Sequence, residues 1–270
     1  MTAIKLWLST VRSTFTNIPA LLVFAVLYAL LLVSAYLFIS TRVATVSQVF
    51  LTYVLMILIP VEFFLFNASI VDRAREERFH WGAILFDAVK FFIVTIPVLL
   101  IAVLLYYLLG KIGARFPPPV TIPLPATAAA TKPQPVHWPT LILATVRFVL
   151  LGIAVPLALI HSWIAVSGTS NALPKRIGSA LARTFAFESV LIYGLGLILF
   201  FVLPYVTLFV PFSPKGNKAD FAVFILRLLL TFALSFIGWV VTISALTRNG
   251  LESPAVRAPV SPAVAAEAAA

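Results

Sequence analysis

The sequence predicts an all-α fold: a polytopic membrane helix bundle of six transmembrane helices, with three interfacial amphipathic helices in a threefold repeat. Apolar residues make up 62% of the chain and charged residues only 10%, whereas an ordinary soluble domain has roughly 25% charged residues. Six apolar segments are long enough to cross a bilayer as a helix, which takes about 20 residues. An amphipathic pattern recurs before every second segment. These observations together indicate an integral membrane protein.

The six spans form one transmembrane domain over residues 1–247. They lie near residues 19–39, 49–70, 88–109, 141–166, 190–212 and 222–247. The first span follows Lys5 and Arg12, as the apolar part of a signal peptide would. Its apolar run is longer than a signal peptide needs, and no clear small-residue cleavage site follows it. We therefore expect this segment to remain in the protein as a span.

Amphipathic segments precede the first, third and fifth spans, near residues 4–18, 80–92 and 174–185. At helical spacing each has large apolar side chains on one face and basic side chains on the other, which is typical of a helix lying in the membrane interface. In the first segment, Trp7 and Phe15 oppose Lys5 and Arg12. The functional interpretation is a platform for lipid or a partner, and the structural one is an elbow where the chain enters its next span.

The chain also resembles itself. Ile59-Pro60 and Val155-Pro156 lie 96 residues apart, and Gly82 corresponds to Gly178 at the same offset. These matches predict three copies of one unit, in which an amphipathic segment precedes a span outward and a span back. Chance similarity among apolar helices is the alternative.

Two segments lie outside the predicted spans. Residues 110–140 are rich in proline, which favours an extended extramembrane loop, and residues 248–270 form an Ala/Pro tail that we expect to be disordered. The segments on the N-terminal side of the membrane hold more Lys and Arg than those on the other side. This bias predicts that both termini are cytoplasmic.

The composition argues against catalysis and cofactors. The chain has no cysteine, and its three histidines have neither a metal-binding motif nor a carboxylate pair around them. We find no nucleophile motif and no phosphate-binding loop, so we expect no enzyme activity, no cofactor and no metal. The net charge of +10 comes largely from residues that flank apolar spans. We therefore expect anionic lipid headgroups, and not nucleic acid, as its counterpart.

Glu62 is an ionisable residue in the apolar run ILIPVEFFLF. Such a group costs about 2.5–3.5 kcal/mol at the centre of a membrane helix, so it normally faces the protein interior or a water-filled cavity. His161 and Lys90 lie toward the same side of the membrane in the predicted topology, and either could contact Glu62. Pro60 frees a backbone carbonyl and permits a kink. The three polar residues form a candidate intramembrane site, or else Glu62 makes one structural contact between helices.

Other basic residues are expected to meet lipid headgroups. They are Lys5, Arg12, Arg147, Lys175, Arg176, Arg183 and Arg227. Arg147 and Arg227 each lie about two turns inside a helix end, from which a long side chain can extend to the headgroups.

The interfacial segment with Gly82 or Gly178, followed by a span in a six-span chain without catalytic motifs, gives a family resemblance. Over roughly residues 50–210 the chain resembles the bacterial six-span membrane proteins grouped with YciC and with the membrane domains of some glycerophosphodiester phosphodiesterases. The phosphodiesterase barrel is absent, so the resemblance does not imply that activity. It implies a protein of the bacterial cytoplasmic membrane with a non-catalytic role.

Two functions are consistent with these features. One is a scaffold or accessory subunit that organises lipid or a membrane complex, with membrane lipids and a membrane protein complex or a second copy of the chain as partners. The other is a small-solute transporter in which Glu62 is an ion or proton ligand, since internal repeats with polar residues near the midplane are typical of transporters.

Overall fold

The computed structural model describes residues 3–42, 45–76, 78–117, 137–167, 178, 182–210 and 217–252. These residues are almost entirely helical, and none of them forms a strand. Six helical segments are long and apolar enough to cross a membrane, which confirms the predicted helical bundle. They are Ile18–Ser40, Val46–Glu76, Trp81–Gly113, Trp138–Val166, Phe187–Phe209 and Asp220–Leu251. The chain is a multi-pass membrane protein.

Some spans are single helices and others are composite. The single helices are α2 (Ile18–Ser40), α3 (Val46–Glu76), α4 (Trp81–Gly113) and α10 (Asn217–Glu252), and α1 (Ala3–Thr16) precedes them. The fourth span joins α5 (Trp138–Arg147), the π-helical η1 (Phe148–Ala154) and α6 (Val155–Val166). The fifth joins α8 (Phe187–Leu197), the π-helical η2 (Ile198–Val202) and α9 (Leu203–Phe209).

The first amphipathic segment forms the separate helix α1. It stops at Thr16, and the Asn17 side chain caps the next helix by accepting a hydrogen bond from the Ala20 N–H at 3.2 Å. Pro19 occupies the first turn of α2, where its missing N–H leaves no helical bond unmade. Leu6 is buried, and α1 packs against α10 and α8.

The second amphipathic segment differs from the sequence prediction of a separate interfacial helix. It forms the first turns of α4, which continues unbroken from Trp81 into the third span. Its buried face, with Ile84, Ala88 and Phe91, packs into the helical core. The segment therefore continues straight into the span and does not form a separate helix in the membrane interface. Of the third amphipathic segment, only residues 178 and 182–185 are described, and 178 and 182–184 are helical.

Helices extend into the segments that were predicted to be a loop and a tail. Helix α4 runs to Gly113 and α5 begins at Trp138, so the spans extend into both ends of the predicted 110–140 loop. Helix α10 continues to Glu252, beyond the expected end of the sixth span. Residues 118–136 and 253–270 lie outside the described residues. The threefold repeat stays a prediction.

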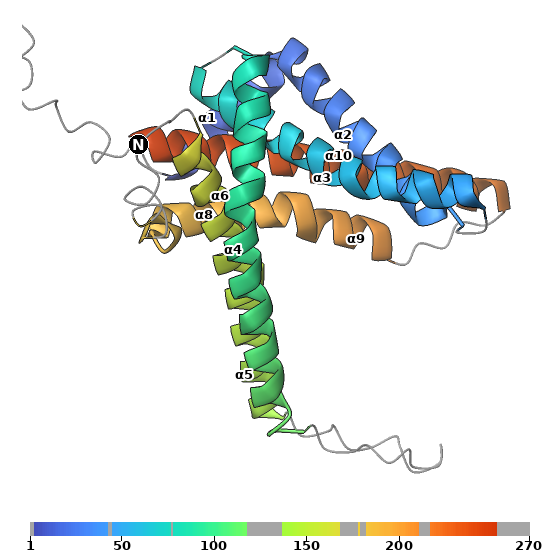
Figure 1. The fold of residues 1–270 in the computed structure, drawn as a ribbon. Helices are drawn as coiled ribbons and strands as arrows, with labels where there is room; N and C mark the ends of the chain where they lie inside the picture. Colours follow the sequence, from blue (N-terminus) through green and yellow to red (C-terminus); the bar gives the residue numbers. More distant parts are fainter. Residues whose placement is uncertain are drawn as a thin grey trace, which may run out of the picture.

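The core lies at one end of the bundle. The large, fully buried side chains come from the C-terminal halves of α3 and α10, the N-terminal half of α4, and α6 and α8. They include Phe66, Phe91, Leu157, Trp163, Ile192 and Ile243. We call this region, together with α1, the convergent end. Figure 1 shows α4 and α5 running side by side away from it.

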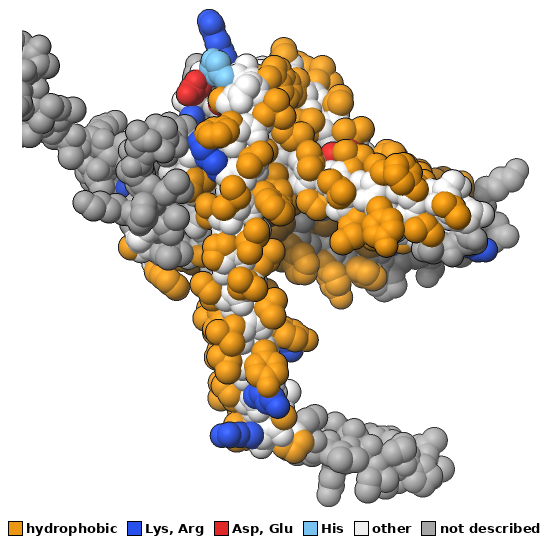
Figure 2. Space-filling view, in the orientation of Figure 1, with side chains coloured by type: hydrophobic (Ala, Val, Ile, Leu, Met, Phe, Trp, Pro, Cys, Tyr) orange, Lys and Arg blue, Asp and Glu red, His pale blue; other side chains and the backbone are white. Residues whose placement is uncertain are grey.

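The opposite halves of the spans carry exposed apolar side chains. Leu100 on α4 is 65% exposed and Ile57 on α3 is 70% exposed. Figure 2 shows apolar side chains along the α4–α5 pair, with basic ones gathered at its far tip. At that tip the Lys111 cation lies 5.4 Å from the ring centre of Tyr107. Further in from the tip, the Arg147 cation lies 4.3 Å from the ring centre of Tyr106. Aromatic and basic residues beyond an apolar band are typical of a helix end at the headgroup level.

Two glycines bring the fifth and sixth spans into close contact. A Cβ atom on Gly196 would lie 2.0 Å from the Oγ1 atom of Thr242, and one on Gly238 would lie 2.7 Å from the backbone nitrogen of Phe200. Neither position has room for a side chain. Small residues at such crossings let membrane helices approach and gain packing contacts.

Candidate functional site

Glu62 is buried where α3 meets α2. The residue is only 4% exposed. Its Oε1 atom accepts a hydrogen bond from the Ser34 hydroxyl at 3.0 Å. The Oε2 atom is buried and has no hydrogen-bond partner among the described residues. The structure therefore pairs Glu62 with Ser34, a residue that the sequence reasoning did not consider, and with neither His161 nor Lys90.

His161 and Lys90 have separate surroundings. His161 on α6 is 3% exposed, and its Nε2 atom has no hydrogen-bond partner within the part of the chain that the structure describes. The Lys90 ammonium pairs with Asp87 one turn earlier on α4 at 2.9 Å, and it lies 4.3 Å from the ring centre of Phe86. The three residues of the candidate intramembrane site therefore have separate surroundings and do not form one site.

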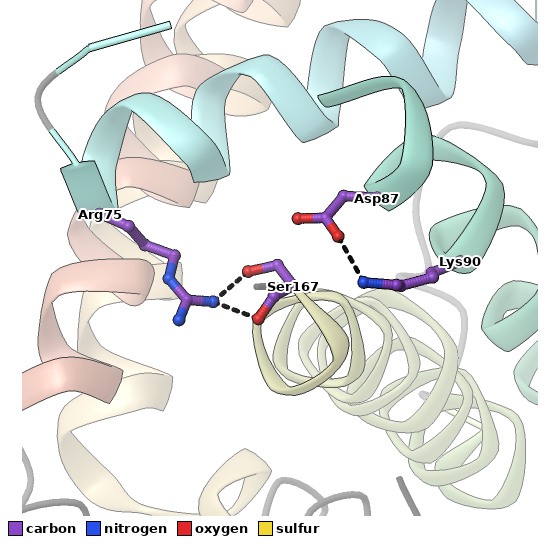
Figure 3. A network of polar contacts seen from close by, with 4 residues as sticks. All are labelled: Arg75, Asp87, Lys90 and Ser167. Carbon is purple, nitrogen blue, oxygen red and sulfur yellow. Dashed lines mark hydrogen bonds and ion pairs between the residues drawn. The ribbon is translucent and has the colours of Figure 1, made fainter. Parts of the chain in front are cut away.

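Figure 3 shows Arg75, Asp87 and Lys90 around the end of α6. The Nη1 atom of Arg75 donates to both the carbonyl and the hydroxyl of Ser167. This contact joins the C-terminal end of α3 to that of α6. Because a basic side chain compensates the partial negative charge of a helix C-terminus, Arg75 stabilises two helix ends at once.

Further polar contacts join the spans in pairs. The indole N–H of Trp163 on α6 donates to Thr95 on α4 at 3.0 Å, and that of Trp239 on α10 donates to Asn67 on α3 at 3.0 Å. The Tyr193 hydroxyl on α8 donates to the carbonyl of Gly152 in η1 at 3.1 Å. In each contact a buried polar group of one span satisfies a polar group of another.

A pocket of about 440 Å³ opens at the convergent end, between α1, α2, α3 and α10. Its polar wall includes Ser13 and Asn17, with the side chains of Arg73 and Arg248 beside them. The Arg248 Nη1 atom donates to the Ser13 hydroxyl at 3.0 Å. The Nη1 atom of Arg73 is buried without a hydrogen-bond partner among the described residues. We call this cavity the basic pocket.

A second cavity is apolar. It has a volume of about 500 Å³ and lies between α3 and α4 beside Pro60, with Phe64 and Phe92 on its walls. Glu62 and His161 line neither this cavity nor the basic pocket. The polar residues singled out from the sequence therefore do not face either opening.

The surroundings of His80 differ from the sequence prediction. Ligand atoms of Asp72, Glu76 and His80 all lie within 4.8 Å of one another, so a carboxylate pair does surround this histidine. The expectation that none of the histidines has one was wrong, because Asp72 and Glu76, four residues apart on α3, share the helix face that His80 meets. Asp72 accepts a hydrogen bond from the His80 backbone N–H at 3.0 Å, and Glu76 pairs with the His80 ring at 3.1 Å. These contacts fix the turn from α3 to α4.

The residues expected at the headgroups are in several situations. Lys5 and Arg12 are exposed on α1, and Arg147 is exposed on α5. Arg183 donates to the Gly250 carbonyl at 3.0 Å, and Arg227 donates to the Val210 carbonyl at 2.7 Å. Both therefore also bind the backbone of another segment. Lys175 and Arg176 lie outside the described residues.

The basic pocket was not predicted from the sequence. Arg73 and Arg248 each follow an apolar run and resemble ordinary positive charges at the end of a span. One feature of the sequence could have indicated that they lie close together. Both occupy the C-terminal part of a helix on the same predicted side of the membrane. Only the packing of α3 against α10 brings them together.

Comparison with known proteins gives no match to a family model, to a curated protein or to a solved structure. The resemblance to the six-span family grouped with YciC stays a prediction.

Proposed function

We propose that this membrane protein is a non-catalytic scaffold or accessory subunit that organises lipid or a membrane complex. This function is supported by the buried polar groups, which form hydrogen bonds between spans. Ser34 and Glu62, Thr95 and Trp163, and Asn67 and Trp239 each join two spans. Polar groups committed to helix pairing hold a frame together and are not displayed to a passing solute.

The apolar surface supports the same proposal. The halves of the spans beyond the convergent end have most of their large side chains exposed, and the α4–α5 pair extends from the body (Figure 1). Such a surface needs acyl chains or the helices of another membrane protein around it. It offers a long lateral face to either partner.

Gentle extraction from the native membrane, followed by mass spectrometry of everything that stays bound, tests this function. We expect a stoichiometric membrane protein, a second copy of the chain or a defined lipid to remain with it. A protein that emerges alone and free of specific lipid, and that moves a solute after reconstitution, would overturn the scaffold proposal.

We place the protein in the bacterial cytoplasmic membrane with both termini in the cytoplasm. The distribution of Lys and Arg and the family resemblance support this location. Because the chain has no cysteine, single cysteines can be added without background labelling. We expect Ser9→Cys on α1 to be protected from a membrane-impermeant maleimide in intact cells, and Ile112→Cys near the far tip to be labelled.

Two observations favour transport as a second function. The Oε2 atom of Glu62 is buried without a hydrogen-bond partner in the described parts of the chain, and two spans are interrupted by π-helix. Paired interruptions are typical of transporter folds. If Glu62 carries a proton or an ion, Glu62→Gln abolishes solute-driven proton uptake into proteoliposomes while the protein stays folded. The matched variant Asp87→Asn, which alters a carboxylate outside this contact, would leave uptake intact.

A further inference from the structure

We propose that the basic pocket binds a phosphate ester, and we assign it to the headgroup of an anionic phospholipid. This inference rests on the lipid-organising role proposed above and names the lipid class. Its ligand is a phosphodiester with a negative charge, such as the headgroup of phosphatidylglycerol.

The charge of the basic pocket favours an anion. Arg73 and Arg248 line the pocket, and none of its described lining residues is a carboxylate. Arginine is always protonated in proteins, and its planar fork fits two phosphate oxygens. Two guanidinium groups in one cavity without an acidic residue leave a net positive charge that an anion would compensate.

Arg73 has a hydrogen-bond donor that an anion could satisfy. The Nη1 atom of Arg73 is buried and has no partner among the described residues, whereas buried donors in proteins are nearly always satisfied. The hydroxyls of Ser13, Thr14 and Thr16 donate to carbonyls of α1. They are therefore already committed, and an anion would be bound mainly by the guanidinium groups.

The N-terminal end of α2 lies at the basic pocket. This helix begins at Ile18, beside the pocket residues Asn17 and Pro19. The N-terminus of a helix has a partial positive charge that favours a phosphate. The C-terminal end of α1 at Thr16 lines the same pocket and offsets part of this charge, so the two arginines supply most of the attraction.

The shape of the pocket favours a lipid over free phosphate. The apolar residues Leu21 and Phe24 of α2 also line the pocket, and α2 continues from there into the bilayer. A phospholipid has an anionic headgroup joined to apolar chains, so it can contact the polar and the apolar lining residues at once. Inorganic phosphate would satisfy only the polar wall.

There is a purely structural alternative for the arginines. Arg73 and Arg248 lie near the C-terminal ends of α3 and α10, where basic residues offset the negative end of the helix dipole without any ligand. This role predicts the same thermal stability in every lipid. The ligand role predicts stability that depends on the headgroup.

The test uses the full chain in nanodiscs of pure phosphatidylcholine and in nanodiscs with one third phosphatidylglycerol. We expect phosphatidylglycerol to raise the thermal midpoint of the wild type and to remain bound in native mass spectrometry. Arg73→Gln should weaken its binding about tenfold, as expected for loss of a charged hydrogen bond. Arg42→Gln changes an exposed arginine just past the C-terminal end of α2, outside the basic pocket, and is the matched control that should bind as the wild type does.

Inorganic phosphate added to the phosphatidylcholine sample separates the two sources of the anion. A rise in the midpoint with millimolar phosphate, and none with phosphatidylglycerol, would overturn the lipid assignment. Equal lipid binding by Arg73→Gln and Arg42→Gln would overturn the pocket itself. Should Arg73→Gln fail to fold, Arg73→Lys keeps the charge and is expected to bind phosphatidylglycerol more weakly than the wild type. If a protein partner co-purifies while phosphatidylglycerol has no effect, the scaffold function stands and the pocket proposal falls.

Discussion

The Tyr193 hydroxyl donates to the carbonyl of Gly152 at 3.1 Å, and Gly152 is the residue whose carbonyl Pro156 leaves without its α-helical partner. In an α-helix the N–H of residue i bonds to the carbonyl of residue i−4, but proline has no N–H. At this point the fourth span is π-helical, and the Val155 N–H bonds to the Leu150 carbonyl five residues back. A side chain of the fifth span thus completes the backbone of the fourth.

Removing this hydroxyl tests the relationship. We expect Tyr193→Phe to reduce the free energy of unfolding by about 1 kcal/mol, the usual size of a hydrogen bond between membrane helices. Thermal or detergent-induced unfolding of the purified protein measures the change.

A double-mutant cycle supplies the control. In Pro156→Ala the restored N–H can bond to the Gly152 carbonyl, so Tyr193→Phe should have a smaller effect there. Equal effects in both backgrounds would show that the hydroxyl does not act on the carbonyl that Pro156 frees.

Gly196 tests the close approach of α8 and α10. A methyl group at this position would overlap the Thr242 hydroxyl, so we expect Gly196→Ala to destabilise the protein by about 1–3 kcal/mol, as overpacking does. Gly194→Ala is the matched control, since a Cβ at Gly194 meets nothing within 4 Å. Thermal unfolding of the two variants should separate them, and identical midpoints would contradict the proximity of the helices.

The positions of the spans could be predicted from the sequence because apolar length alone marks them. The location of the core could not, because a lipid-facing leucine and a core leucine are equally apolar. Helix α2 illustrates this. Its apolar residues surround it on all sides, so periodicity does not indicate which face meets α3. For the same reason Ser34 could not be named as the partner of Glu62.

The helix interruptions were also partly predictable. Pro156 and Pro204 lie in the fourth and fifth apolar runs, and a proline there removes one backbone hydrogen bond. The response of the backbone depends on tertiary contacts. Pro60 and Pro97 lie within continuous α-helices, whereas Pro156 and Pro204 each follow a π-helical stretch. The basic pocket was beyond prediction because its arginines come from distant helices.

We expect the end of α6 to depend more on the Arg75 side chain than on the Ser167 side chain. We expect Arg75→Ala to release the end of α6, since it removes both hydrogen bonds to Ser167. Hydrogen exchange at residues 160–167 should become faster. In Ser167→Ala the backbone carbonyl still accepts from Arg75, so the exchange rates should change less. A larger effect from Ser167→Ala would contradict this ranking.

Ser34→Ala tests the environment of Glu62. The substitution removes the hydrogen bond to Oε1, and a buried polar group that loses its partner costs about 1–3 kcal/mol. The double variant Ser34→Ala with Glu62→Leu removes the polar group as well, so it should be more stable than Ser34→Ala alone. Thermal midpoints decide between them, and a double variant less stable than the single one would point to a further interaction of the carboxylate.

The confinement of the core to one end has a consequence for how the protein fits its bilayer. At 1.5 Å per residue, a span as long as α4 extends about 50 Å, well beyond a hydrocarbon layer of about 30 Å. Long spans accommodate such a mismatch by tilting. Because the six spans are tied together mainly at the convergent end, we expect their far halves to bend or spread apart while the joined halves stay packed. The protein can therefore adapt to membranes of different thickness while its joined end keeps one structure.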